Sequence, residues 1–423
     1  MELKSITISG YRNVSNVKLK LDNITSMLSL NNFGKSNVLK GIDFGCRFIQ
    51  KVPSEKSFMM LHSSNIPINI YMENTNFHFE FESEVNHDNK LYSLIYGYEF
   101  KWGYGDENPL ITKEYLKVKD INNSLKYTQL IKRENNRALY KHSETGRCSS
   151  VLKIQGNELV INKLFAFDDL YYIELIKEIN SLDILIEDHL DTKAYCTPKP
   201  VIRKGTELES RKNGSLSRDL YMLKKNHPNQ YSLLVDAFTK LFPEITAIIP
   251  QRFKLTPSDQ KISETDNYLL SKEIYITFVE DKNFREPIGI EVLSDGARRI
   301  LMILTEIIYA NIKGTSLIAI EEPENSVHPR LFQSYIEIIS QLLDNCKLII
   351  TSHSPFMMSY FNPSKIYVGV NRKPGVAEFF KLSNSGVNRL MKESEKYDTS
   401  TGDYLFELLT DPESNIKEYL DIS

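Results

Sequence analysis

Hydrophobic and polar residues alternate with a period of two over the first part of this chain. The pattern predicts strands at Leu3–Ser9, Val14–Leu21 and Thr25–Leu30, followed by a loop and a helix at Val38–Phe48. The alternation resumes at Phe77, Phe79 and Phe81 and in Tyr92–Trp102. One apolar and one polar face are typical of an antiparallel sheet. We expect that sheet, or an insertion into it, to continue through the short strands and polar turns from about 106 to 159.

A helical period follows in the middle of the chain, and the final third combines both kinds of element. Helices are predicted at Asp169–Asn180, Leu216–Lys225 and Gln230–Leu241, and a strand at Glu273–Glu280. Apolar strands at Leu317–Ile320 and Lys347–Thr351 then alternate with helices at Ile300–Ile312 and Leu331–Leu343. Such alternation indicates a buried parallel sheet. We expect a mixed α/β fold, with a helical cap in the polar tail after Ser385.

The loop between the third strand and the first helix reads SLNNFGKSN, residues 29 to 37. It matches the phosphate-binding pattern G-x-x-x-x-G-K-[ST] at Gly34, Lys35 and Ser36, but Ser29 stands where the first glycine is expected. Asn31 and Asn32 tolerate left-handed backbone and suit a tight loop. Lys35 would reach the β- and γ-phosphates, and Ser36 would bind Mg²⁺. The alternative is an ordinary loop before a basic helix start.

Paired carboxylates end the apolar strand LIAIEEPEN, at Glu321 and Glu322. The carboxyl ends of strands are where α/β folds bind ligands. One carboxylate beside a phosphate loop can hold Mg²⁺ through water, and the next can polarise the attacking water. The alternative is an acidic helix start after a core strand.

Two further motifs also have a structural alternative. Ser294, Asp295 and Gly296 precede an apolar helix, so Ser294 either caps the helix or helps to hold a phosphate oxygen; the two are compatible. His353 follows the strand KLIITS and is either structural or a group that senses the γ-phosphate. The four motifs occur in one order, each at a strand end or helix start, which favours a shared site.

Composition excludes several classes of protein. The chain has 423 residues, of which 41% are hydrophobic, and a net charge of -3, so it can bury a large core and is not polybasic. Its four cysteines form no C-x-x-C pair, which argues against a disulfide framework or a cysteine metal site. The N-terminus reads as a strand and not as a signal sequence. We expect a cytoplasmic protein.

These motifs resemble those of ABC-type ATPases of the SMC, RecF and OLD branch, most closely the compact AAA15/AAA21-type ATPases of prokaryotic defence loci. The similarity rests on ITSMLSLNNFGKSN, VLSDGARRILMIL, IAIEEPENSVHP and LIITSHSP in this order, and on the KLFPEI region within Leu216 to Ile249. It covers the chain from Met1 to about Leu382. It implies an ABC-type P-loop ATPase head with a mixed sheet, an antiparallel β region and a helical insertion.

The resemblance also implies roles for residues. ATP and Mg²⁺ are the expected cofactors, with Ser36 and Glu321 on the metal, Glu322 as the base for water and His353 as the switch histidine. Ser294, Asp295 and Gly296 would be the signature that acts on ATP held by a second subunit, so that hydrolysis requires a head-to-tail dimer. The ATP-binding residues would be Ser29, Asn31, Asn32, Gly34, Lys35, Ser36 and Asn37.

The expected organisation has four parts. Residues 1–105 and 216–383 form the two portions of the ATPase head, 106–215 form an insertion, and 384–423 form a tail. Ser29 departs from the family pattern, and Glu321 stands where many relatives have Asp. About 70 residues follow His353, fewer than the nuclease domain of full OLD-type proteins needs.

Three functions remain open from the sequence. The first is an ATPase, as a dimer or higher oligomer, that senses or gates a separate effector, such as a nuclease, in antiphage defence. The second is a RecF-like or SMC-like ATPase that binds DNA, with basic candidates at Lys132, Arg133, Arg137 and Lys141. The third is a nucleotide-locked scaffold with slow hydrolysis.

Overall fold

The chain divides into two compact units. Unit 1 comprises Met1–Asp188, Gly314–Glu322 and Asn345–Ser423, and unit 2 comprises His189–Lys313 and Pro323–Asp344. The structure is a computed structural model and describes residues 1–63, 65–87, 90–105, 109–167, 169–187, 191–198, 201–203, 215–255, 268–270, 273–371, 373–411 and 414–422. Over those ranges, no helix combines the length and the apolar composition needed to cross a lipid bilayer.

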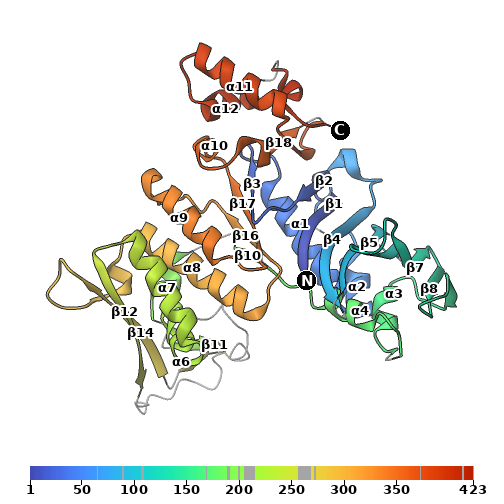
Figure 1. Cartoon of the computed structure of the whole chain (residues 1–423), viewed down its shortest axis with the longest axis horizontal. Coiled ribbons are helices and arrows are strands. Elements are labelled where there is room, and N and C mark those ends of the chain that lie inside the picture. The colour runs from blue at the N-terminus through green and yellow to red at the C-terminus, as the bar shows by residue number, and fades with distance from the viewer. Residues whose placement is uncertain are drawn as a thin grey trace. The chain divides into compact units, whose positions relative to one another are not determined.

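Unit 1 is built on one 14-stranded mixed sheet (Figure 1), in the order β10-β16-β17-β3-β18-β19-β2-β1-β4-β5-β6-β7-β8-β9. In chain order its strands are β1 (Glu2–Tyr11), β2 (Val14–Lys20), β3 (Ile24–Leu28), β4 (Phe77–His87), β5 (Lys90–Lys101), β6 (Leu110–Asp120), β7 (Thr128–Glu134), β8 (Arg137–Lys141), β9 (Cys148–Leu152), β10 (Ile184–Glu187), β16 (Leu317–Glu321), β17 (Lys347–Ser352), β18 (Ile366–Asn371) and β19 (Ala377–Lys381). The predicted mixed α/β fold is confirmed.

The two halves of this sheet pair differently, as the sequence pattern predicts. The strands β10, β16, β17, β3 and β18 pair with one another in parallel, in that order, whereas β2, β1 and β4 to β9 pair antiparallel in series. Between these halves, β18 pairs antiparallel with β19, and β19 pairs in parallel with β2. The predicted antiparallel region therefore continues through β6 to β9 as part of the same sheet. β18 and β19, which the pattern did not reveal, lie between β3 and β2 and join the two halves.

Helices of unit 1 cover and extend this sheet. They are α1 (Lys35–Gln50), α2 (Pro53–Met59), α3 (Val160–Leu164), α4 (Ile173–Asn180), α10 (Met357–Tyr360), α11 (Asn384–Lys396) and α12 (Thr401–Thr410), with single 3₁₀ turns η1 (Ile70–Met72), η3 (Pro363–Lys365) and η4 (Ile416–Tyr419). α1 packs against β1 and β2 in the middle of the sheet order and against the edge strand β10.

An aromatic layer holds α1 on the antiparallel half of the sheet. Phe77 and Phe79 of β4 are fully buried, and the ring of Phe77 lies 5.0 Å from that of Phe44 on α1. A β-carbon at Gly45 of α1 would overlap the ring of Phe79, so glycine permits this close approach. Burial of each such ring contributes about 2 to 3 kcal/mol. The layer therefore fixes the helix that follows the 29–34 loop.

A buried charged cluster fastens the chain between β9 and α3. The carboxylate of Glu114 accepts hydrogen bonds from the N–H groups of Val160 at 2.6 Å and Ile161 at 3.0 Å. Burial nevertheless raises the pKa of Glu114. Arg133 is 1% exposed and donates to the carbonyl oxygen of Gln155 at 3.0 Å. The expectation of Arg133 as a surface cation is therefore wrong, because its side chain points to the buried face of β7.

Unit 2 combines helices with small sheets. Its helices are α5 (Thr192–Cys196), α6 (Leu216–Asn226), α7 (Pro228–Leu241), α8 (Asp295–Lys313) and α9 (Pro329–Leu342), with the 3₁₀ turn η2 (Ile290–Val292). The strands β12 (Ile245–Lys254), β14 (Glu273–Asp281) and β15 (Ile288–Gly289) form one sheet, and β11 (Val201–Arg203) pairs with β13 (Tyr268–Leu270). α6 packs on the larger sheet, and α8 contacts α5, α7 and α9.

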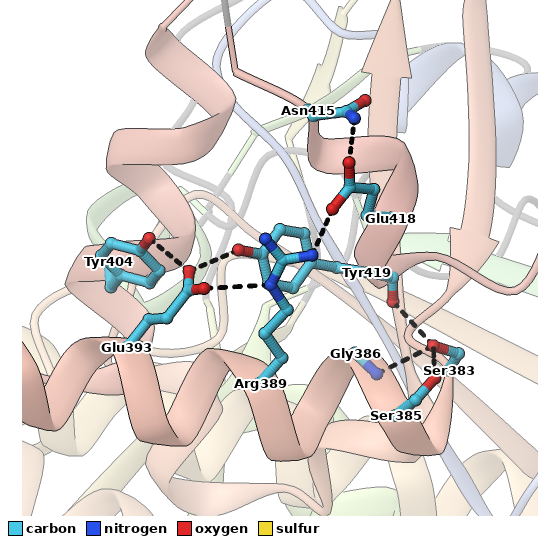
Figure 2. A network of polar contacts seen from close by, with 9 residues as sticks. All are labelled: Ser383, Ser385, Gly386, Arg389, Glu393, Tyr404, Asn415, Glu418 and Tyr419. Atoms are coloured by element: carbon cyan, nitrogen blue, oxygen red, sulfur yellow. Dashed lines mark hydrogen bonds and ion pairs between the residues drawn. The ribbon is translucent and has the colours of Figure 1, made fainter.

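The elements α11, α12 and η4 form a C-terminal cap held by one carboxylate. Figure 2 shows Glu393 of α11 accepting hydrogen bonds from Tyr404 of α12 at 2.7 Å and from Tyr419 of η4 at 2.6 Å. Arg389 donates to Glu393 at 3.0 Å and also pairs with Glu418. The three elements of the C-terminal cap thus meet at Glu393.

We predict that Glu393 makes the C-terminal cap sensitive to acid. Hydrogen bonds from Tyr419, Tyr404 and Arg389 lower the pKa of Glu393 from its ordinary value of 4.5 to about 2. A depressed pKa in the folded state means that the stabilisation is present above about 4.5 and is lost as the pH falls toward about 2. Because solvent screens this site, we expect a contribution of about 1 kcal/mol.

The measurement is hydrogen exchange of the α11 and α12 amides between pH 2.5 and 6. Glu393→Gln should speed exchange in the C-terminal cap at pH 6 and flatten its pH dependence. The matched control is Glu395→Gln, an exposed residue of the same helix. Equal pH dependence in Glu393→Gln and the wild type would contradict this prediction.

Candidate functional site

The loop of residues 29–34 turns through left-handed backbone into α1. Asn32 has a φ of 65° and Gly34 a φ of 89°, so the left-handed conformation expected for the asparagine pair occurs at Asn32. α1 begins at Lys35, three residues earlier than the sequence pattern predicts, and the N–H of Val38 donates to the carbonyl of Gly34 at 2.9 Å. The N–H groups of the first turn therefore lie directly after the loop, where a helix favours an anion.

Gly34 is required by its surroundings as well as by its φ. A β-carbon there would lie 2.5 Å from the β-carbon of Ala377 and 3.1 Å from Oδ1 of Asn13. Ala377 begins β19, and Asn13 lies in the turn between β1 and β2. The loop is thus packed against two segments that the sequence motif does not include.

Lys35 is folded back onto the strand end that precedes the loop. Its Nζ donates to the carbonyl oxygen of Ser29 at 2.8 Å, to Oγ of Ser29 at 3.1 Å and to the carbonyl oxygen of Leu30 at 3.2 Å. The side chain is buried, and Ser29 is fully buried. Oxygen atoms of the loop therefore hold the ammonium group of Lys35. A bound anion would compete with these oxygen atoms for it.

Arg12 and Asn13, which belong to none of the sequence motifs, hold Asn37 in the first turn of α1. Nη1 of Arg12 donates to Oδ1 of Asn37 at 2.9 Å, and Nδ2 of Asn37 donates to Oδ1 of Asn13 at 2.8 Å. Arg12 has a left-handed φ of 52°. The only signal in the sequence is a short polar interruption, YRN, between two predicted strands.

The acidic pair lies at the end of β16. Glu321 is the last residue of this strand and pairs with Thr351 of β17. Glu322 has a φ of 51°, and its N–H donates to the carbonyl of Thr351 at 2.8 Å. Left-handed backbone is unfavourable for a residue with a side chain and tends to occur at functional sites. The strand pairing holds Glu322 in this conformation.

His353 meets the acidic pair directly. Its Nδ1 lies 2.7 Å from Oε1 of Glu322, and the two side chains are 42% and 31% exposed. Both residues follow neighbouring parallel strands, β17 and β16. The pair is therefore accessible from solvent and preorganised by the sheet.

Parallel pairing brings the loop to the same edge. β17 lies between β16 and β3, and Ser352 of β17 pairs with Leu28 of β3. The N–H of Ser29 donates to the carbonyl of Ser352 at 3.4 Å. The structure thus brings the loop, the acidic pair and His353 to the carboxyl edge of three adjacent strands, as the order of the motifs predicts.

The donor atoms at this edge suit a magnesium ion. Ser36 offers a hydroxyl in the first turn of α1, and Glu321 offers a carboxylate at the end of β16. Mg²⁺ prefers oxygen ligands and usually keeps several waters, so it needs few ligands from the protein. Across the described part of the chain, no group of three or more His, Cys, Asp and Glu side chains could hold a metal ion. The fit therefore rests on oxygen chemistry at this edge.

The predicted signature residues belong to unit 2. Oγ of Ser294 accepts a hydrogen bond from the N–H of Ala297 at 3.2 Å. Ser294 therefore caps α8, which is one of the two roles that the sequence predicts for it. Asp295 accepts from Thr192, pairs with Arg298 at 3.3 Å, and has a pKa lowered chiefly by the Thr192 hydrogen bond. Ser294 and Asp295 are exposed. The start of α8 is thus a capped and exposed surface.

Gly296 is fixed by a backbone contact within unit 2. A β-carbon at this position would overlap the carbonyl oxygen of Ser326, which itself has a left-handed φ of 65°. Ser326 lies four residues after Glu322 in the chain. The start of α8 is therefore packed against the segment that follows the acidic pair in the sequence.

The C-terminal cap contacts the segment after His353. A β-carbon at Gly402 of α12 would overlap the carbonyl oxygen of Pro355, and α10 also packs against α12. Both contacts lie within unit 1. The chain that leaves the His353 position therefore runs directly under the C-terminal cap.

Comparison with protein families finds a match over most of the chain. The family model described as AAA ATPase domain (AAA_15) matches residues 1–358. No curated protein matches the chain significantly.

Solved structures with some similarity include the SMC head domain from Thermotoga maritima, with 11% identity, a TM-score of 0.41, and coverage of 90% of this chain and 100% of that one. Another is the SmcHead bound to the C-winged helix domain of ScpA, with 12% identity, a TM-score of 0.45, and coverage of 92% and 100%.

We predict that Gly34 cannot be replaced without a change at Ala377. Gly34→Ala should lower the free energy of unfolding by about 3 kcal/mol, because it adds left-handed strain of about 1 kcal/mol to an overlap with Ala377. Adding Ala377→Gly should recover the overlap part. Chemical unfolding of the single and double variants measures both terms.

Gly105→Ala is the matched control, since Gly105 has a φ of 56° and no atom lies within 4 Å of its added β-carbon. It should show the strain alone. If Ala377→Gly recovers nothing in the Gly34→Ala chain, the close approach of Ala377 is not the constraint.

Proposed function

We propose, from the premise that this chain belongs to the AAA ATPase domain family over residues 1–358, that it binds ATP with Mg²⁺ and hydrolyses it. The observation that carries the proposal is the contact between His353 and Glu322 at 2.7 Å, at the sheet edge where the 29–34 loop enters α1. A helix start that would hold phosphate, beside a carboxylate that would position water, fits the hydrolysis of a phosphoanhydride.

The proposal gives each residue of the edge a role. Ser29, Asn31, Asn32, Gly34 and Asn37 shape the loop and the helix start around the phosphates, with Lys35 on the β- and γ-phosphates. Ser36 and Glu321 would hold Mg²⁺, which would neutralise charge on the phosphate oxygens when bound. Glu322 would orient and deprotonate the attacking water, and His353 would hold Glu322 in place and contact the γ-phosphate region.

We further propose that two subunits form the complete site. The resemblance to ABC-type ATPases assigns Ser294, Asp295 and Gly296 to the ATP of a second subunit. The exposure of Ser294 and Asp295 at a capped helix start supports this, because such a surface can meet a phosphate from outside the unit. A head-to-tail dimer would place two ATP molecules between the subunits.

The ATPase would act on a separate effector in antiphage defence. The resemblance to compact ATPases of defence loci motivates this part. The contact between Gly402 and Pro355 supports it, because the C-terminal cap touches the chain two residues beyond His353. A change at the nucleotide site can therefore reach a surface that an effector such as a nuclease could bind.

The burial of two of the four basic candidates weakens the support for the DNA-binding alternative. Of its four basic candidates, Arg133 is 1% and Lys141 is 8% exposed, and a buried cation does not reach a DNA phosphate. Lys132 and Arg137 are exposed, but Lys132 pairs with Glu134 at 3.1 Å. The scaffold alternative predicts nucleotide-dependent assembly with little turnover, so the rate of hydrolysis separates it from the leading proposal.

We predict that ATP hydrolysis by the purified protein depends on Lys35 and Glu322. Lys35→Ala should remove both ATP binding and turnover, whereas Glu322→Gln should lower kcat by at least about 100-fold and keep ATP binding, because it removes a base but no phosphate ligand. Phosphate release and ATP titration measure the two effects.

Lys51→Ala and Glu337→Gln are surface controls and should behave as the wild type. Turnover that persists at the wild-type rate in both Lys35→Ala and Glu322→Gln would exclude the assigned site. Stable ATP-bound oligomers with negligible wild-type turnover would favour the scaffold instead.

We predict that two inactive variants restore each other if the signature acts on a partner's ATP. Ser294→Arg and Lys35→Ala should each be inactive alone. In an equal mixture, half of the dimers combine the two variants and keep one intact site, so about a quarter of the wild-type activity should return. Activity that stays absent while mixed dimers form would exclude the trans arrangement.

A further inference from the structure

Ser29 occupies the place of the expected loop glycine, and a glycine faces it from the next strand. β18 pairs in parallel with β3, with Val368 opposite Leu28. The following residues on the two segments are Gly369 and Ser29. A β-carbon at Gly369 would lie 2.7 Å from the β-carbon of Ser29, a separation that packed carbon atoms do not tolerate. Only one of these two positions can carry a side chain without a shift of the backbone.

Ser29 has no space in which to avoid this contact. It is fully buried, and its N–H donates to the carbonyl of Ser352 on β17 at 3.4 Å. It therefore lies between β17 on one side and β18 on the other. On the β18 side, the ring of Phe379 also covers Gly369, because an added β-carbon would lie 2.8 Å from its Cε1.

The hydroxyl of Ser29 acts on Lys35. Oγ of Ser29 accepts a hydrogen bond from Nζ of Lys35 at 3.1 Å, beside the carbonyl oxygen of the same residue at 2.8 Å. A glycine at position 29 would keep the carbonyl but not the hydroxyl. An ammonium group has three donors, so each acceptor inside the loop competes with a phosphate oxygen for Lys35.

We infer that Ser29 and Gly369 form a compensating pair that positions Lys35. Gly369 of β18 leaves the space that a glycine at position 29 would otherwise leave, and the Ser29 side chain fills it. The Ser29 hydroxyl then holds the Lys35 ammonium group inside the loop until a nucleoside triphosphate binds and takes over this ammonium group. Ser29 is a positioning residue, because it acts through Lys35. The inference rests on the proposed ATP-binding function and extends it to residues outside the motif.

The first test is a double-mutant cycle of Ser29→Gly and Gly369→Ala. It is measured by ATP calorimetry in the Glu322→Gln background, which prevents turnover, and by thermal unfolding. Gly369→Ala should weaken ATP binding at least about tenfold and lower Tm when Ser29 is present, because the new β-carbon displaces Ser29. Ser29→Gly should recover the part of both losses that comes from the overlap with Ser29, while the overlap with Phe379 remains. Equal losses in the two backgrounds would overturn the pairing and assign them to Phe379.

Gly97→Ala is the matched control for crowding. An added β-carbon at this strand glycine would lie 2.6 Å from the hydroxyl oxygen of Tyr115, in β5 and β6. It should lower Tm with no recovery by Ser29→Gly. Recovery there would show that Ser29→Gly stabilises the fold generally and would also overturn the pairing.

The second test is Ser29→Ala, which removes the hydroxyl and keeps the β-carbon. ATP should bind about two- to tenfold more tightly, because the free state loses one acceptor for the Lys35 ammonium group. A purely structural role for Ser29 predicts unchanged or weaker binding, and either result would overturn the positioning role.

The design separates this inference from the function on which it rests. If the wild type binds no ATP, the proposed function fails, but the Tm arm of the cycle still reports whether residues 29 and 369 compensate each other. If ATP binds and the two substitutions act additively, the function stands and the pairing is excluded.

Discussion

Parallel pairing of β16, β17 and β3 is the constraint on which the candidate site depends. The three strands end at one edge. Ser29 therefore lies near Glu322 and His353, although about 290 and 320 positions separate them in the chain, and no long side chain has to bridge the distance. The same pairing holds Glu322 in left-handed backbone through the carbonyl of Thr351. Chemistry at this edge is therefore a property of the sheet register, since a slip of one residue would turn every side chain to the other face.

Sequence patterns predicted those strands and site residues that depend only on nearby residues in the chain. Alternation at Phe77, Phe79 and Phe81 indicated the antiparallel half, and continuous apolar runs at 317–320 and 347–351 indicated the parallel half. The loop, the acidic pair and His353 were found because each follows a strand and carries a chemically specific residue. Their meeting at one edge could be inferred because parallel strands in an α/β fold share their carboxyl edge.

Other features were not predictable, because they arise from contacts between distant segments. Gly369 lies in an ordinary apolar run, VGV, and has meaning only when β18 pairs with β3. The sequence predicted Arg133 to be one of several surface cations, whereas the register of β7 places its side chain in the interior. Arg12 and Asn13 looked like a turn, and only their hydrogen bonds to Asn37 relate them to the loop. Single-residue type does not encode such pairings.

Gly402 gives the C-terminal cap a particular mechanical character. Because no side chain lies between α12 and the carbonyl of Pro355, the two backbone segments are in direct contact at this point. Side chains absorb small displacements by rotating, whereas peptide groups at van der Waals contact are stiff. A shift of the chain beyond His353 would therefore be passed on as movement of the whole helix, with the hydrogen bonds at Glu393 carrying α11 and η4 along with it. The three elements of the C-terminal cap would then move together as one unit.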